Sequence, residues 1–174
     1  KLYLSGGAFS AYNSPNSVDY SLFNADLSQS PAVSQNLYLN GLTYANTLGT
    51  DAAPVNYTPT IGSRGTEGLL AGSEIAEIIL YDGSKSIDRQ KITSYLATKY
   101  GITLNQTTPQ NYVASDGTIY WNGTTNATYS NNIAGIARDD NSDLYQKQSQ
   151  SINTGNHIIT SIGTFTTANL TNTT

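Results

Sequence analysis

The chain has 174 residues, a formal net charge of −4 and 11% charged residues, whereas Ser, Thr and Asn make up about a third of it. The acidic balance argues against a nucleic-acid partner, which requires a basic face, and the lack of cysteine excludes a disulfide scaffold and a thiolate zinc site. No apolar run reaches the ~18 residues of a membrane-spanning helix. The many Thr and Tyr residues suit strands and the Asn, Ser and Gly residues suit turns, so the composition predicts a mainly β protein.

The first part of the chain alternates short strand patterns with polar loops. Asn40-Gly41 closes one of these patterns and is the strongest short hairpin signal in the sequence. The predicted strands lie at 1–4, 18–27, 36–42 and 57–61.

Residues 75–81 form an apolar run that is broken only by Glu77, and Asp82-Gly83 follows as a turn. We predict a strand here, because its length suits a strand and turn residues end it.

A helix is predicted directly after that turn. Ile92, Tyr95, Leu96 and Tyr100 recur at three- and four-residue spacing, so they share one face, which we expect to be buried at a structural junction. Ser84 or Ser86 is expected to cap its start, with Asp88 in the first turn. Gly101 is expected to end it in a left-handed conformation.

The part after the helix is again β-rich. Residues 103–110 are polar and contain Pro109, as in a linker between two regions. Ser115-Asp116-Gly117 separates two strand patterns and predicts a second hairpin. The strands expected here lie at 112–114, 118–121, 133–137 and 157–162.

Several segments of the sequence resemble a known family. LYLNG at 37–41, TIGSRG at 60–65 and LLAGSEIAEIILYD at 69–82 resemble the C-terminal half of a concanavalin A-like, laminin-G-like domain. The resemblance implies an antiparallel β-sandwich of the jelly-roll type with one helix at the junction to a second β-rich region. Such a sandwich needs about twice the number of strands that are predicted before Glu74. Residues 1–83 are therefore expected to be a partial domain.

The later segments resemble the domains that follow in large secreted surface proteins of the Bacteroidetes group. SIDRQKITSYLATKYGITL at 86–104 is similar to their connecting helix, and NYVASDGTIYW at 111–121 with NNIAGIARDDNSDLYQKQSQSIN at 131–153 is similar to their next domain. We therefore expect a connecting helix at 84–104 and an incomplete second β-rich domain at 105–174. The resemblance implies an extracellular location on the bacterial cell surface.

One segment suggests a metal site. Asp139, Asn141 and Asp143 occupy alternate positions, as oxygen ligands do at the start of a calcium loop. Leu144 stands where such a loop needs glycine, and no Glu follows at the required distance. A polar turn and a calcium site both remain open, and no other cofactor is expected.

Other candidate sites have weaker patterns. Glu74 and Glu77 lie three residues apart and would point to opposite faces of a strand, which does not suit a pair of catalytic carboxylates. His157 is the only histidine, and no nucleophile-elbow motif accompanies it. The aromatic residues that offer flat surfaces for sugar rings, each with strand packing as the alternative, are Tyr12, Tyr20, Tyr44, Tyr57, Tyr120, Trp121 and Tyr129.

These patterns include no catalytic constellation. The first hypothesis is a non-enzymatic structural or adhesive module of a large secreted adhesin or filament protein, whose partners are other domains of the same polypeptide or neighbouring copies. The second is a carbohydrate-binding, lectin-like domain with glycans as partners. A third is the remnant of a glycosidase.

Overall fold

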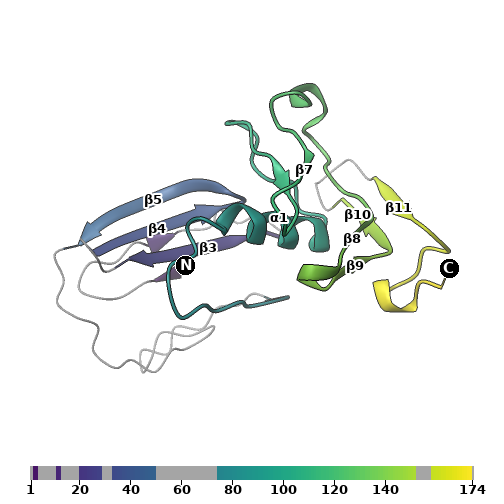
Figure 1. Ribbon diagram of the computed structural model, residues 1–174, viewed down its shortest axis with the longest axis horizontal. Helices are drawn as coiled ribbons and strands as arrows, with labels where there is room; N and C mark the ends of the chain where they lie inside the picture. Colours follow the sequence, from purple (N-terminus) through teal and green to yellow (C-terminus); the bar gives the residue numbers. More distant parts are fainter. Residues whose placement is uncertain are drawn as a thin grey trace.

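The computed structural model describes residues 2–3, 11–12, 20–28, 33–49, 74–151 and 158–173. In these residues, small antiparallel sheets of two or three strands accompany a single α-helix (Figure 1). The mainly β organisation with one helix is therefore confirmed. No helix in the described part of the chain is long and apolar enough to span a bilayer. The strand predicted at 57–61, together with Tyr57 and His157, lies outside the described residues.

The largest sheet joins β3 (Phe23–Ser28), β4 (Val33–Leu39) and β5 (Leu42–Gly49) in sequence order. Asn40 and Gly41 connect β4 to β5 with φ of 46° and 84°, the paired positive angles of a type I′ turn. The predicted Asn-Gly hairpin is thus confirmed. The Asn40 side chain also accepts a hydrogen bond from the Leu22 N–H at 2.8 Å, and the Asn40 N–H donates to the Leu22 carbonyl oxygen at 2.9 Å. These two bonds fix the turn to the strand entering β3.

A two-stranded sheet pairs β1 (Leu2–Tyr3) with β2 (Ala11–Tyr12). The first of these strands matches the strand predicted at 1–4, whereas the sequence patterns predict no strand at 11–12.

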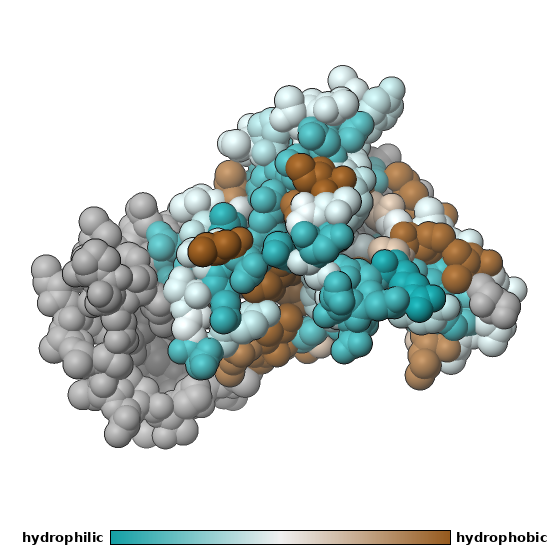
Figure 2. Space-filling view, in the orientation of Figure 1, coloured by the Kyte–Doolittle hydropathy of each residue, from teal (hydrophilic) through white to brown (hydrophobic). Residues whose placement is uncertain are grey.

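The strand predicted at 75–81 is not formed. This segment has no strand partner among the described residues and lies drawn out below the helix (Figure 1). Its apolar side chains are largely exposed, Leu80 at 78% and Ile75 at 52%, and hydrophobic surface is visible in this area (Figure 2). The prediction failed because an apolar run shows strand propensity but does not supply the neighbouring strand that a ladder requires.

The helix α1 (Arg89–Tyr100) forms as predicted and ends at Gly101, whose φ is 65°. Its start differs from the prediction. The N-cap residue is Asp88, without a side-chain capping bond, and the Ser84 hydroxyl instead accepts a weak bond from the Ser86 N–H at 3.4 Å.

The fully buried side of α1 is not the one predicted. It consists of small residues, Thr93, Ser94, Ala97 and Thr98. Small side chains let the helix approach the hairpin of β6 (Tyr112–Val113) and β7 (Ile119–Trp121), where the Ser94 hydroxyl accepts a bond from the Val113 N–H at 2.9 Å. The residues expected to be buried, Ile92, Tyr95, Leu96 and Tyr100, are only half-buried. The apolar pattern was misleading because close helix–strand contact selects side-chain size over hydrophobicity.

A small core lies where α1 meets this hairpin. Ala97, Leu104 and Tyr112 are buried, and Trp121 and Ile133 pack against them. The rings of Tyr112 and Trp121 meet edge to face, with centroids 5.6 Å apart. The hairpin around Ser115-Asp116-Gly117 is confirmed.

Four further strands form two separate hairpin-like pairs. β8 (Ala137–Asp139) pairs with β9 (Leu144–Gln146), and β10 (Gln148–Gln150) pairs with β11 (Ile159–Ser161). Residues 133–136, predicted as strand, precede β8 without joining a ladder; Ile133 packs on the core instead, which explains its apolar character. Short 3₁₀ turns η2 (Ala127–Tyr129), η3 (Asp140–Ser142) and η4 (Asn169–Thr171) complete this part.

The C-terminal segment is attached through hydrogen bonds of amide side chains, where a strand ladder would otherwise be expected. The Asn169 side chain accepts bonds from the N–H groups of Lys147 (2.6 Å) and Gln148 (3.2 Å) and donates to the Tyr145 carbonyl oxygen (2.6 Å). The buried Gln148 side chain bonds the N–H and carbonyl oxygen of Thr166 at 2.9 and 2.7 Å. The Asn-rich composition therefore supports tertiary structure as well as turns.

Candidate functional site

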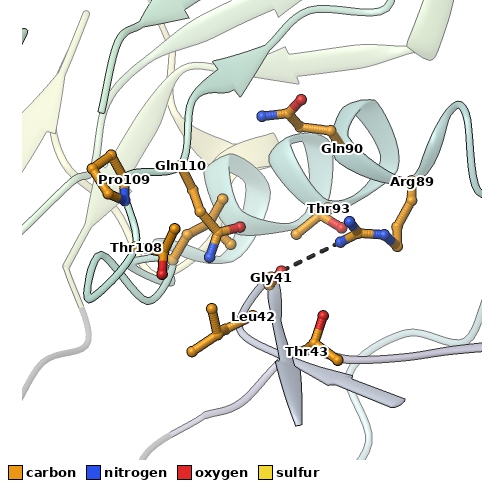
Figure 3. A pocket seen from close by; sticks show the side chains of 10 residues that line it. Gly41, Leu42, Thr43, Arg89, Gln90, Thr93, Thr108, Pro109 and Gln110 are labelled. Atoms are coloured by element: carbon orange, nitrogen blue, oxygen red, sulfur yellow. Dashed lines mark hydrogen bonds between the residues drawn. The ribbon is translucent and has the colours of Figure 1, made fainter. Parts of the chain in front are cut away.

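The Asn40-Gly41 turn docks between the start of α1 and the loop at 104–110 (Figure 3). The Asn105 N–H donates to the Asn40 carbonyl oxygen at 2.8 Å, and Arg89 Nη1 donates to the Gly41 carbonyl oxygen at 3.3 Å. The Arg89 guanidinium carbon also lies 3.9 Å from the centroid of the Tyr38 ring, a stacked cation–π contact. We call this contact region the hairpin joint.

The polar segment expected to be a linker forms one wall of the hairpin joint. Gln106 bonds the backbone N–H and carbonyl oxygen of Gln110 at 2.9 and 3.1 Å, and Gln110 Nε2 donates to the Asn105 carbonyl oxygen at 2.7 Å. These side-chain bonds give the loop a fixed shape. The φ of 84° at Gly41 favours glycine, and a Cβ atom there would displace the end of the Gln110 side chain.

A cavity of about 250 Å³ lies in the hairpin joint. Its polar lining comes from the first turns of α1, the start of β5 and the 104–110 loop, and Figure 3 shows Arg89 reaching from α1 towards the turn. The lining residues are Gly41, Leu42, Thr43, Arg89, Gln90, Thr93, Leu104, Thr108, Pro109 and Gln110. The sequence patterns did not identify this site, because its residues come from three segments without a shared motif.

A second attachment holds the segment at 74–81 to the other end of α1. Glu77 Oε2 accepts hydrogen bonds from Lys99 Nζ at 2.9 Å and from the Tyr100 hydroxyl at 2.8 Å, while Lys99 also bonds the Tyr95 hydroxyl at 2.9 Å. We call this cluster the Glu77 tether. It gives Glu77 a structural contact, and Glu74 lies exposed apart from it.

The pKa values in the Glu77 tether follow from these contacts. Burial raises the pKa of Glu77, but the hydrogen bonds from Lys99 and Tyr100 and the positive charge of Lys99 outweigh burial, so that this pKa lies below its ordinary value. For Lys99, burial lowers the pKa, and the bonds to Glu77 and Tyr95 raise it further than burial lowers it. Burial and the bond to Glu77 raise the pKa of Tyr100. Glu77 and Lys99 thus form an ion pair at neutral pH.

The segment proposed as a calcium loop contains a turn held by its own hydrogen bonds. The Asp139 carboxylate accepts bonds from the Ser115 N–H at 2.8 Å and hydroxyl at 2.6 Å, and these bonds hold its pKa below the ordinary value. Asp140 pairs with Arg138 at 2.7 Å, and Asp143 is left-handed with φ of 53°. No cluster of three or more His, Cys, Asp or Glu side chains suited to a metal occurs among the described residues. Calcium binding by Asp139, Asn141 and Asp143 stays a prediction.

The aromatic candidates differ in their surroundings: some pack against other residues and others are exposed. Trp121 packs on the core, and the Tyr120 hydroxyl shares a 2.7 Å hydrogen bond with the Thr98 hydroxyl. Tyr20, Tyr44 and Tyr129 are exposed, Tyr129 at 78%.

Comparison with known proteins identifies one family. The family described as "Domain of unknown function (DUF8202)" matches residues 88–174, half of the chain, and its match begins at the N-cap of α1. No curated protein matches the chain, and no solved structure does. The matched part contains α1 and the strands that pack on it, β6, β9 and β10.

Proposed function

The chain belongs to the DUF8202 family, whose description assigns no activity. We propose that it is a non-enzymatic structural and adhesive module of a large secreted protein of the bacterial cell surface, with the structural role argued from its contacts and the setting from the sequence resemblance. Residues 1–83 would belong to a jelly-roll sandwich of the laminin-G-like type and α1 would connect it to the next domain. The resemblance of residues 37–153 supports this setting.

The observation that carries the structural role is that two separate N-terminal segments are fastened to one helix. The hairpin joint attaches the β4–β5 turn near Arg89, and the Glu77 tether attaches residues 74–81 near Lys99. Lys99 lies ten positions after Arg89 in the sequence, which is about 15 Å along a helix. Each attachment thereby fixes its own N-terminal segment to α1.

The polar groups in these two attachments serve structural bonds. The Glu77 carboxylate forms an ion pair with Lys99. Outside the two attachments, the Asp139 carboxylate accepts hydrogen bonds from Ser115. Neither carboxylate has the raised pKa of a general acid. These contacts support the non-enzymatic interpretation.

The structural role is tested by loosening the hairpin joint. Gly41→Ala should loosen the docked turn, because the new Cβ would displace the Gln110 side chain from its place in the hairpin joint and the φ of 84° is unfavourable to alanine. Gly117→Ala is the matched control, since Gly117 has φ of 95° but no atom near its Cβ position. In ¹⁵N relaxation measurements on the full chain, we expect β4–β5 to tumble with α1 in the wild type and the control, and to move independently in Gly41→Ala. A hairpin that already moves independently in the wild type contradicts the proposal.

Adhesion and catalysis need separate assays. A glycan array with the full chain distinguishes the structural role from the lectin-like alternative, which clear saccharide binding through Tyr20, Tyr44 or Tyr129 would support. Hydrolysis of a polysaccharide that is lost in Glu77→Gln would refute the non-enzymatic proposal.

A further inference from the structure

A buried hydroxyl group in the hairpin joint has no hydrogen-bond partner in the part of the chain that the structure describes. Thr93 is 2% exposed and lines the cavity, and its Oγ1 makes no hydrogen bond to any described residue. The next residue behaves differently, because the Ser94 hydroxyl donates to the Gln90 carbonyl oxygen at 2.7 Å. Leaving a buried hydroxyl unpaired is unfavourable, and such a group in a native structure calls for a partner.

Arg89 supplies a positive charge beside the same cavity. Among the described residues, its one hydrogen bond goes to the Gly41 carbonyl oxygen, although a guanidinium offers five N–H donors. No carboxylate lies within ion-pair distance of Arg89 in the described part of the chain, whereas Lys91 and Lys99 pair with Asp88 and Glu77. Arg89 also stands in the first turn of a 12-residue helix, where the helix dipole favours an anion.

The rest of the cavity wall combines hydroxyl and amide groups with a few apolar side chains. Thr43, Thr108 and Gln110 can both donate and accept hydrogen bonds. Leu42, Leu104 and Pro109 provide apolar surface. Such a wall suits a molecule that has hydroxyl groups on a carbon skeleton, and a volume of about 250 Å³ limits it to roughly a single sugar ring or smaller.

We propose that this cavity binds a small hydroxycarboxylate, with its carboxylate on Arg89 and a hydroxyl group on Thr93. The guanidinium fork matches a carboxylate through two parallel N–H···O bonds. The Thr93 hydroxyl gains its missing partner from the ligand. The proposed site requires the hairpin joint, in which the cavity lies, but it does not require the structural and adhesive role proposed above.

The test is a chemical-shift titration of the full chain with D-glucuronate. We expect saturable shifts at the amides of Gly41, Arg89, Thr93 and Gln110. D-Glucose lacks the carboxylate and acetate lacks the hydroxyl groups, so each should bind at least about tenfold more weakly, as expected from the loss of charged or neutral hydrogen bonds. Binding of acetate as tight as that of glucuronate, or no shifts at the cavity amides, overturns the proposal.

Variants assign the roles of the two residues. Arg89→Gln should weaken glucuronate binding by about tenfold or more, and Thr93→Val by about threefold or more, whereas Lys91→Gln, whose lysine pairs with Asp88 outside the cavity, should leave it unchanged. Arg89→Lys keeps the positive charge and is the control for a disturbance of the hairpin joint in Arg89→Gln. It should bind glucuronate with an affinity between those of the wild type and Arg89→Gln. Unaltered affinity in Thr93→Val and Arg89→Lys together contradicts the assignment.

The ligand could reach the site as a free acid or as the end residue of a glycan. Methyl β-D-glucuronoside distinguishes these sources, because its anomeric position is blocked as in a glycan. Equal binding of the methyl glycoside and free glucuronate identifies a glycan end as an acceptable ligand, and loss of binding identifies the free acid. Both results support the cavity as a hydroxycarboxylate site.

Discussion

Removal of the Tyr112 hydroxyl group from the core should lower the free energy of unfolding. Tyr112 is 1% exposed, and its hydroxyl accepts a hydrogen bond from the Leu104 N–H at 2.8 Å and donates to the Ile102 carbonyl oxygen at 3.3 Å. Tyr112→Phe keeps the ring and leaves these two backbone groups without that partner. An unsatisfied buried group costs about 1–3 kcal/mol. The longer bond adds little, so we expect a loss of about 1–3 kcal/mol in the free energy of unfolding.

Urea and thermal unfolding, followed by tryptophan fluorescence, measure this loss. Trp121 is the only tryptophan and its ring contacts that of Tyr112, so the signal reports on the same core. For a chain of this size, 1–3 kcal/mol corresponds to a decrease in Tm of about 2–12 °C. Tyr129→Phe is the matched control, because Tyr129 is 78% exposed, and should change stability by less than about 0.5 kcal/mol. Equal stability of Tyr112→Phe and Tyr129→Phe would show that water replaces the lost hydroxyl and would refute this reasoning.

Three further changes test other contacts. Gly101→Ala should destabilise strongly, by about 2 kcal/mol or more, because the new Cβ would overlap the Gln150 carbonyl oxygen and φ is 65°; wild-type stability in urea unfolding would contradict this contact. The lowered pKa of Glu77, in which the bonds to Lys99 and Tyr100 outweigh burial, stabilises the fold above the ordinary pKa of about 4.5, and this contribution is lost as pH falls through the folded-state pKa. The difference in urea midpoint between wild type and Glu77→Gln should therefore be largest at neutral pH and shrink below about pH 4.5; a constant difference would exclude the ion pair as its cause. Asn169→Ala should raise amide hydrogen exchange around β9 and β10, because two backbone N–H groups lose their acceptor, and unchanged exchange there would mean that the side chain is dispensable.

Local signals in the sequence predicted the turns and the C-terminal end of the helix well. Asn40-Gly41 and Gly101 adopt positive φ as expected, because glycine and asparagine accept that conformation more readily than other residues. This steric preference depends only on a residue and its immediate neighbours, so it can be predicted from a single sequence. The same holds for the hairpin around Asp116-Gly117.

Features that depend on distant partners could not be predicted in this way. Residues 75–81 have the composition of a strand, but pairing requires a neighbour that composition does not specify. The buried side of α1 at Thr93 and Ala97 reflects the closeness of β6, which the spacing of apolar residues does not encode. The cavity beside Arg89 combines three segments and was missed for the same reason.

The docked turn at Asn40-Gly41 also changes how this chain can be engineered. Exposed hairpin turns usually accept inserted tags or epitopes, but here the turn backbone is bonded to Arg89 and Asn105, so an insertion would undo the hairpin joint. Asp82-Gly83 offers a different position, because no atom lies within 4 Å of a Cβ built on Gly83 and the residue before it is exposed. A fluorophore or affinity peptide inserted there would lie in the connection between the Glu77 tether and α1. It would be close to both and would not disturb the contacts of either.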